Sequence, residues 1–169
     1  MIDINWVDYG YWKNWRSPWG DIEIERRSDY CDRGRVAIKT NTEGAVNILF
    51  EPLLSGAYFF DEGRAIEHLK SVVALAESCS EEQPRDSSEV KIGKTQKVLE
   101  GKDCICFLHI IMPRSIVTPV FCFDVEVRPG KQETFSVDWA DGFPRYYLNR
   151  DIAEAELQAW MECRNQVLE

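Results

Sequence analysis

Carboxylates near the ends of predicted strands are the first side chains in this chain that could do chemistry. They are Asp124, Glu126, Asp138 and Asp141. Two such acids, one protonated and one ionised, form the working pair of a glycosidase-like hydrolase. No spacing in the sequence sets their geometry, however, and similar pairs can be drawn in almost any acidic protein. We therefore do not expect an enzyme, and the alternative is a small hydrolase that uses Asp138 and Asp141.

Few residues in this sequence could bind a metal ion. His68 and His109 are the only histidines, which excludes zinc sites built from several imidazoles. We expect His109 to be a hydrogen-bonded core histidine within an apolar strand, and His68 to be exposed at the margin of a helix. Cys104 and Cys106, with Cys122 across a hairpin, have the spacing of alternate core positions rather than that of zinc knuckles. The sequence predicts no metal and no cofactor.

The most distinctive stretch is an aromatic segment within residues 1–19. Four of the six tryptophans and two tyrosines fall within fourteen residues, interleaved with polar and basic side chains. No single period organises them, and Gly10 and Pro18 limit any helix to about two turns. Trp, Tyr and Arg are the residues enriched at interface hot spots, so this segment is a candidate partner-binding site. Its candidate residues are Trp6, Tyr9, Tyr11, Trp12, Trp15, Arg16 and Trp19.

Two other interpretations of the aromatic segment stay open. The rings could cap one open face of the sheet as a flap, because Trp and Tyr bury large areas and keep their polar tips at a rim. They could also stack on a neutral sugar or on bases. The net acidity of the chain argues against bases but not against a sugar.

The charge of the chain is concentrated in two places. The 169 residues carry a formal net charge of −9, and the excess of acids lies in residues 61–89 and 138–169, where helices are predicted. A net-acidic surface argues against nonspecific binding to nucleic acid or to anionic membranes, and it permits steering toward a basic protein. Exposed helix faces that carry solubilising charge would give the same pattern.

Cysteine use and the chain start predict a reducing cytoplasm. We expect no disulfide framework among the six cysteines, because no basic, apolar leader precedes them and three lie in an apolar hairpin. The chain has no Asn-x-Ser/Thr acceptor, and its longest apolar run is about half a membrane span.

Hydrophobic periodicity predicts strands and two helices. A hairpin within residues 103–127 organises the sheet, because its first arm, residues 104–112, is apolar at every position except His109. The helices are expected over residues 62–79, with Asp61 as N-cap, and over about residues 151–167, where Asp151 and Glu154 resemble a capping box. The other predicted strands are residues 2–7, 21–25, 35–39, 45–50, 89–92, 95–99 and 133–139.

These elements predict one α+β domain over residues 1–169. We expect a mostly antiparallel sheet of about seven to nine strands with the two helices packed on one face, and a polar surface loop at residues 80–88. Small acidic proteins with no assembled active site are similar in composition to bacterial toxin-immunity proteins. We therefore expect an immunity-type inhibitor that neutralises a cognate protein by steric occlusion. A homo-oligomer and a carbohydrate-binding protein with a Trp-lined pocket remain alternatives.

Overall fold

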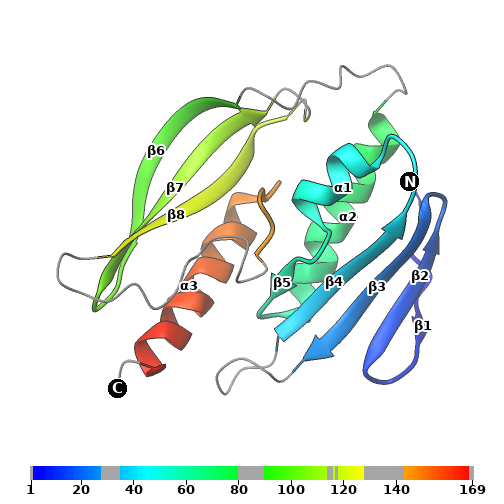
Figure 1. Ribbon diagram of the computed structural model, residues 1–169, viewed down its shortest axis with the longest axis horizontal. Coiled ribbons are helices and arrows are strands. Elements are labelled where there is room, and N and C mark those ends of the chain that lie inside the picture. Colours follow the sequence, from blue (N-terminus) through cyan, green and yellow to red (C-terminus); the bar gives the residue numbers. More distant parts are fainter. Residues whose placement is uncertain are drawn as a thin grey trace.

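The fold combines two sheets with three helices. The computed structural model describes residues 2–27, 35–79, 90–113, 116, 118–127 and 143–167. Within these ranges, eight strands form two antiparallel sheets (Figure 1). The predicted α+β class is confirmed. The expected single sheet is wrong, because five strands belong to one sheet and three to the other, and the helices number three instead of two.

The first sheet is built from strands that follow one another in the sequence. Its order is β1-β2-β3-β4-β5, and every neighbouring pair is antiparallel. Alternate residues turn inward, so that Trp15 lies opposite Ile22 and Ile24 lies opposite Ile38, all of them buried. The bounds are β1 Val7–Asp8, β2 Trp12–Ser17, β3 Gly20–Arg27, β4 Arg35–Thr42 and β5 Tyr58–Phe59.

Gly20 allows the tight turn between β2 and β3. Its φ of +134° is a conformation that L side chains rarely adopt, and a Cβ there would lie 2.3 Å from the carbonyl oxygen of Asn41 on β4. The Ser17 hydroxyl donates to the Gly20 carbonyl at 2.6 Å and closes the turn. The aromatic segment therefore runs through a strand and a hairpin turn, and the predicted limit of two helical turns does not apply.

Two helices lie on one face of this sheet (Figure 1). α1 spans Asn47–Leu53 and α2 spans Glu62–Ser78. The strand predicted at residues 45–50 is wrong, because Leu49, Phe50 and Leu53 are buried with helical spacing. α2 confirms its prediction, since the Asp61 carboxylate accepts from the Arg64 N–H at 2.8 Å.

The second sheet has the order β6-β7-β8. The predicted hairpin supplies its central strand, β7, and one edge strand, β8. β6 spans Val90–Glu100, β7 spans Cys104–Pro113 and β8 spans Val120–Val127. The two strands predicted at residues 89–92 and 95–99 join into β6, with an irregular register between them. The predicted strand at residues 133–139 and the loop at residues 80–88 lie outside the described residues.

Helix α3, Arg150–Val167, packs on the second sheet and links it to the rest of the molecule (Figure 1). The helix forms as predicted, but its cap is different. The Asn149 side chain accepts from the N–H groups of Asp151 and Ile152 at 2.8 and 3.3 Å, so Asn149 stands where Asp151 was expected.

One buried core runs through both sheets and the helices between them. It includes Ile24 from the first sheet, Cys106 from the second, Leu69 from α2 and Trp160 from α3. The last strand of the first sheet, β5, is only two residues long, and the chain enters α2 shortly after it. None of the three helices, within the ranges given above, is long and apolar enough to cross a membrane.

Candidate functional site

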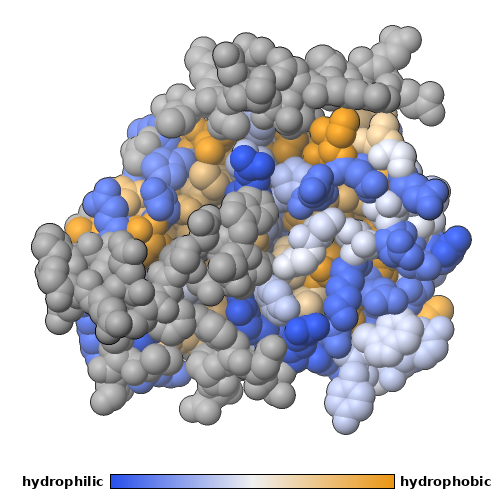
Figure 2. All heavy atoms as spheres, viewed as in Figure 1, coloured by the Kyte–Doolittle hydropathy of each residue, from blue (hydrophilic) through white to orange (hydrophobic). Residues whose placement is uncertain are grey.

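The exposed part of the aromatic segment is a hairpin, residues 7–12, which we call the aromatic hairpin. The exposed fractions are 52% for Val7, 57% for Tyr9 and 82% for Tyr11. Tyr9 stacks on Trp12 with ring centroids 4.2 Å apart and an interplanar angle of 17°. Figure 2 shows pale aromatic side chains protruding at the lower right, where Figure 1 places β1 and β2. The hairpin is thus an aromatic projection from one edge of the first sheet.

Local hydrogen bonds define the conformation of the turn. The Asp8 carboxylate accepts from the Gly10 N–H at 2.8 Å, as short polar side chains do in tight turns. The Tyr9 N–H donates to the Trp12 carbonyl at 2.9 Å. Gly10 has a φ of +92°, which a side chain would strain. Together these contacts hold Tyr9 beside Trp12 and leave Tyr11 at the tip.

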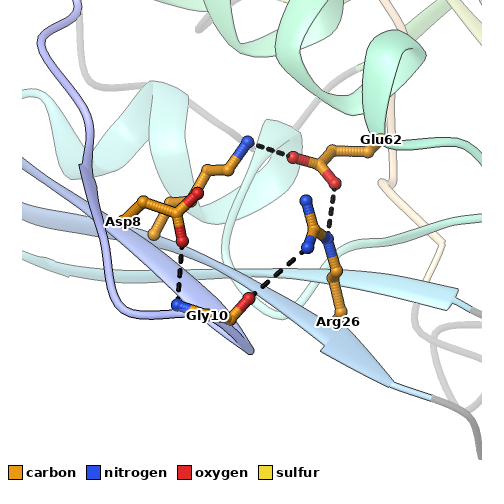
Figure 3. Close-up of polar contacts among 5 residues, drawn as sticks. Asp8, Gly10, Arg26 and Glu62 are labelled. Atoms are coloured by element: carbon orange, nitrogen blue, oxygen red, sulfur yellow. Dashed lines mark hydrogen bonds and ion pairs between the residues drawn. The ribbon is translucent and has the colours of Figure 1, made fainter.

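Glu62, the first residue of α2, fastens the hairpin to the body of the protein (Figure 3). Its carboxylate accepts from the Lys13 ammonium at 2.6 Å and from Arg26 Nε at 2.8 Å. Arg26 also donates to the Gly10 carbonyl at 3.4 Å, and its backbone N–H donates to the Tyr11 carbonyl at 2.8 Å. Hydrogen bonds from Arg26 and Lys13 lower the pKa of Glu62, so this carboxylate is ionised at neutral pH.

The other predicted partner-binding residues divide between core and surface. Trp15 is only 3% exposed, because β2 turns its side chain toward the core. It therefore belongs to the core and not to the exposed surface. Trp6 and Trp19 are half-buried against the core, and the Trp19 ring meets Phe50 edge-on at 5.5 Å. Arg16 is exposed and pairs with Asp21 at 2.7 Å. The segment therefore both caps the core and presents an exposed patch, two roles that the sequence left as alternatives.

Trp12 shares its face of the sheet with a row of acids on β3. Glu25 lies opposite Trp12, and Glu23 and Asp21 follow along the strand. Neighbouring cations balance this row, since Arg16 pairs with Asp21 and the hydrogen bond from Lys39 lowers the pKa of Glu25. Two of the three acids on this face, Asp21 and Glu25, are thus paired with cations, while Glu23 accepts from the Asn14 amide at 3.5 Å.

Three buried polar residues escaped prediction from the sequence. His68 is wholly buried and not exposed as expected, and its Nε2 lies 2.7 Å from the Leu53 carbonyl, to which it must donate. Burial lowers its pKa to about 4. Glu156 accepts from the Phe60 N–H at 2.8 Å and from Arg64 Nε at 2.7 Å, and burial raises its pKa. The two Glu156 contacts join α3 to α2 and to the residue that follows β5.

Tyr147 completes this buried cluster. Its ring packs against His68 at 5.7 Å, and its hydroxyl has no hydrogen-bond partner among the described residues. Burial raises the pKa of the phenol well above its ordinary value. One feature of the sequence could have indicated that His68 and Glu156 are buried. His68 lies next to the core residue Leu69 on α2, and Glu156 lies next to the core residue Leu157 on α3.

The residues that could support catalysis do not form an activated group where the structure describes them. Cys122 lies opposite His109 across β7 and β8, but burial raises the pKa of the thiol to about 11, so it is protonated at neutral pH. His109 is half-buried, where we expected a core position. Asp124 and Glu126 are exposed on β8, and Asp138 and Asp141 lie outside the described residues.

The cysteines depart from expectation at one position. Cys79, Cys104, Cys106 and Cys122 are free, but Cys163 on α3 is disulfide-bonded, where no disulfide was expected. In the described ranges, no three His, Cys, Asp or Glu side chains converge as a metal site.

Comparisons with known proteins offer no relative that bears on this site. No family model, no curated protein and no solved structure matches the chain significantly.

Proposed function

We propose that the chain is a protein-binding module that recognises another protein through the aromatic hairpin. The observation that carries the proposal is the exposure of Tyr9 and Tyr11, at 57% and 82%, on a turn held by Glu62. Exposed apolar side chains that cluster on one surface, unlike scattered ones, mark interaction sites. Trp and Tyr are also the residues that supply most of the energy at protein interfaces.

Preorganisation strengthens this proposal. Binding loses affinity when a loop or side chain must be ordered, at about 0.5–1.5 kcal/mol for each immobilised side chain. Here Tyr9 is already stacked on Trp12, and the turn is held by Asp8 and Arg26 before any partner arrives. Less affinity is therefore lost to ordering these residues when a partner binds.

The finer proposal is an immunity-type inhibitor that covers the active surface of a cognate toxin or effector. The net charge of −9 would speed encounter with a basic partner at long range, while the rings would set the lifetime of the complex. In this proposal the net charge of the whole molecule provides the steering, and the aromatic hairpin provides the lasting contacts. Inhibition would be steric, because a bound partner's catalytic surface would be hidden.

The test is a capture experiment with matched variants. The tagged protein is incubated with lysate of its native host at low and high salt, beside the double variant Tyr11→Ala/Trp12→Ala and the control Met112→Ala. Met112 is 44% exposed on β7, away from the hairpin, so its truncation should not matter. We expect one stoichiometric protein that the double variant loses and the control keeps, and whose own activity is inhibited on reconstitution. A protein retained equally by all three would contradict the proposal.

A second function is favoured by the stacked pair itself. Tyr9 is exposed and stacks on the half-buried Trp12, and an exposed aromatic ring is a surface on which a neutral sugar can stack. Titration with sugars, followed by tryptophan fluorescence, separates this case from protein binding. Light scattering of the purified protein separates a third case, in which a second copy covers the hairpin.

A further inference from the structure

The first turn of α2 contacts two remote parts of the chain. On one side, the Glu62 carboxylate accepts from Lys13 Nζ at 2.6 Å and from Arg26 Nε at 2.8 Å, beside the aromatic hairpin (Figure 3). On the other side, Arg64 Nε donates to the Glu156 carboxylate of α3 at 2.7 Å. The turn therefore connects the hairpin to α3.

Two further hydrogen bonds define the position of this turn. The Asp61 carboxylate accepts from the Arg64 N–H at 2.8 Å and caps the helix. Immediately before the cap, the Phe60 N–H donates to the other carboxylate oxygen of Glu156 at 2.8 Å. Glu156 thus holds the chain on both sides of Glu62 in the sequence. A displacement of the turn would carry the Glu62 carboxylate away from its partners on β2 and β3.

Arg26 extends this connection into the hairpin. Its guanidinium donates to the Gly10 carbonyl at 3.4 Å, and its backbone N–H donates to the Tyr11 carbonyl at 2.8 Å. Both acceptors belong to the turn that carries the exposed rings. The position of the Arg26 side chain, and with it the conformation of the turn, therefore depends on where α2 places the Glu62 carboxylate.

Burial separates Glu156 from any partner protein. Its side chain has no exposed surface, whereas the side chain of Glu62 is 23% exposed and that of Arg64 is 30% exposed. A partner at the hairpin therefore has no access to the Glu156 carboxylate. An effect of Glu156 on partner binding must be transmitted through the protein and cannot come from direct contact.

We propose that the first turn of α2 couples the docking of α3 to the conformation of the aromatic hairpin, with Glu156 and Glu62 as positioning residues. This inference rests on the proposed function, because it describes how affinity at the same site is controlled. Coupling between two sites is reciprocal, so a partner bound at the hairpin also strengthens the contact between the Phe60 N–H and Glu156.

Amide hydrogen exchange, followed by nuclear magnetic resonance, tests the coupling in the free protein. The Tyr9 N–H, which donates to the Trp12 carbonyl, reports on the hairpin, and the buried Leu54 N–H in its bond to the Phe50 carbonyl is the reference. We expect Tyr9 exchange relative to Leu54 to be faster by roughly fivefold in Glu62→Gln and by about twofold or more in Glu156→Gln.

The matched control is Glu67→Gln, which removes the same charge from an exposed position of α2 and should leave Tyr9 exchange unchanged. Folding of each variant is checked by circular dichroism and urea denaturation, because Glu156→Gln removes a buried ion pair. Arg64→Lys is the second variant, since it keeps a cation near Glu156 but loses the Nε hydrogen bond.

Calorimetric titration with the partner captured by the unchanged protein completes the test. Glu62→Gln and Glu156→Gln should weaken binding by the same factors as they accelerate Tyr9 exchange. The double variant should lose less than the product of the two factors, because both residues act on one turn. Partner binding should also slow exchange of the Phe60 N–H.

The proposed function and this inference fail separately. If Tyr11→Ala/Trp12→Ala keeps the partner, the proposed function fails and the inference falls with it. If that double variant loses the partner but folded Glu156→Gln binds as tightly as Glu67→Gln, only the inference is overturned. It is also overturned if Tyr9 exchange is unchanged in Glu156→Gln, or if Glu62→Gln weakens binding without faster exchange, since Glu62 would then contact the partner directly.

Discussion

Lowering the pH from 7 to 5 should destabilise this protein through His68. The imidazole is wholly buried against Tyr147 and Phe59 and donates to the Leu53 carbonyl, and burial lowers its pKa to about 4. An unfolded chain titrates its histidine near the ordinary value of 6.5. Between these two pKa values the unfolded state takes up more protons, so stability falls as the pH falls. For one such group, the free energy of unfolding decreases by about 2 kcal/mol between pH 7 and pH 5.

Other buried acids act in different directions or ranges. Burial raises the pKa of Glu156, so the folded state takes up that proton first and gains stability as the pH falls. Asp103 and Glu62 have lowered pKa values, and their contribution to stability is lost at more acidic pH, below the ordinary carboxyl range. The contribution of His68 must therefore be isolated by comparison with a variant.

The assay is urea denaturation followed by tryptophan fluorescence at pH 7, 6 and 5. His68→Gln keeps a side-chain donor for the Leu53 carbonyl but cannot titrate, so its loss of stability over this range should be smaller by about 2 kcal/mol. His109→Gln is the matched control and should keep the full dependence, because it retains His68. The reasoning is refuted if the unchanged protein and His68→Gln lose the same free energy between pH 7 and pH 5.

Three further outcomes follow from the described contacts. Asp103→Asn should cost about 3 kcal/mol or more in urea denaturation, because it removes the counter-charge of the buried Arg164 guanidinium. Trp15→Ala should cost about 3–5 kcal/mol by leaving a core cavity, whereas Tyr11→Ala should change stability by less than about 0.5 kcal/mol; equal effects would contradict their assignment to core and surface. Asn149→Ala should cost about 1 kcal/mol through loss of the α3 cap, and a thermal melt with no shift would argue against that cap.

Sequence patterns predicted the elements whose period is long and regular. The hairpin of β7 and β8, the helices α2 and α3 and the β3–β4 pair all follow from repeated apolar spacing. The strand prediction for residues 45–50 was wrong because a short apolar run fits a strand or a helix equally well. Only the packing of Leu49 and Leu53 against α2 decides between them. The division into two sheets depends on how far pairing continues past β5, which no local pattern encodes.

The candidate sites were predicted only in part. Clustered Trp and Tyr pointed to the aromatic hairpin, but the exposed rings became known only when β2 placed Trp12 outward and Trp15 inward. The contact between Cys104 and Met161 could not be foreseen either, because 57 residues separate them and they meet only through the packing of α3 against β7. Long-range convergence of this kind is a property of the fold.

The order of strands in the two sheets has a consequence for how the chain folds. Each sheet is a meander of consecutive strands, so its pairings close short loops and cost little chain entropy. The contacts that join α3 to α2 and to the residue that follows β5 are remote in sequence. Glu156 on α3 is 96 residues from Phe60 and 92 residues from Arg64. We expect the two meanders to form early and α3 to dock late. Changes at Glu156 would then accelerate unfolding and leave the folding rate nearly unchanged.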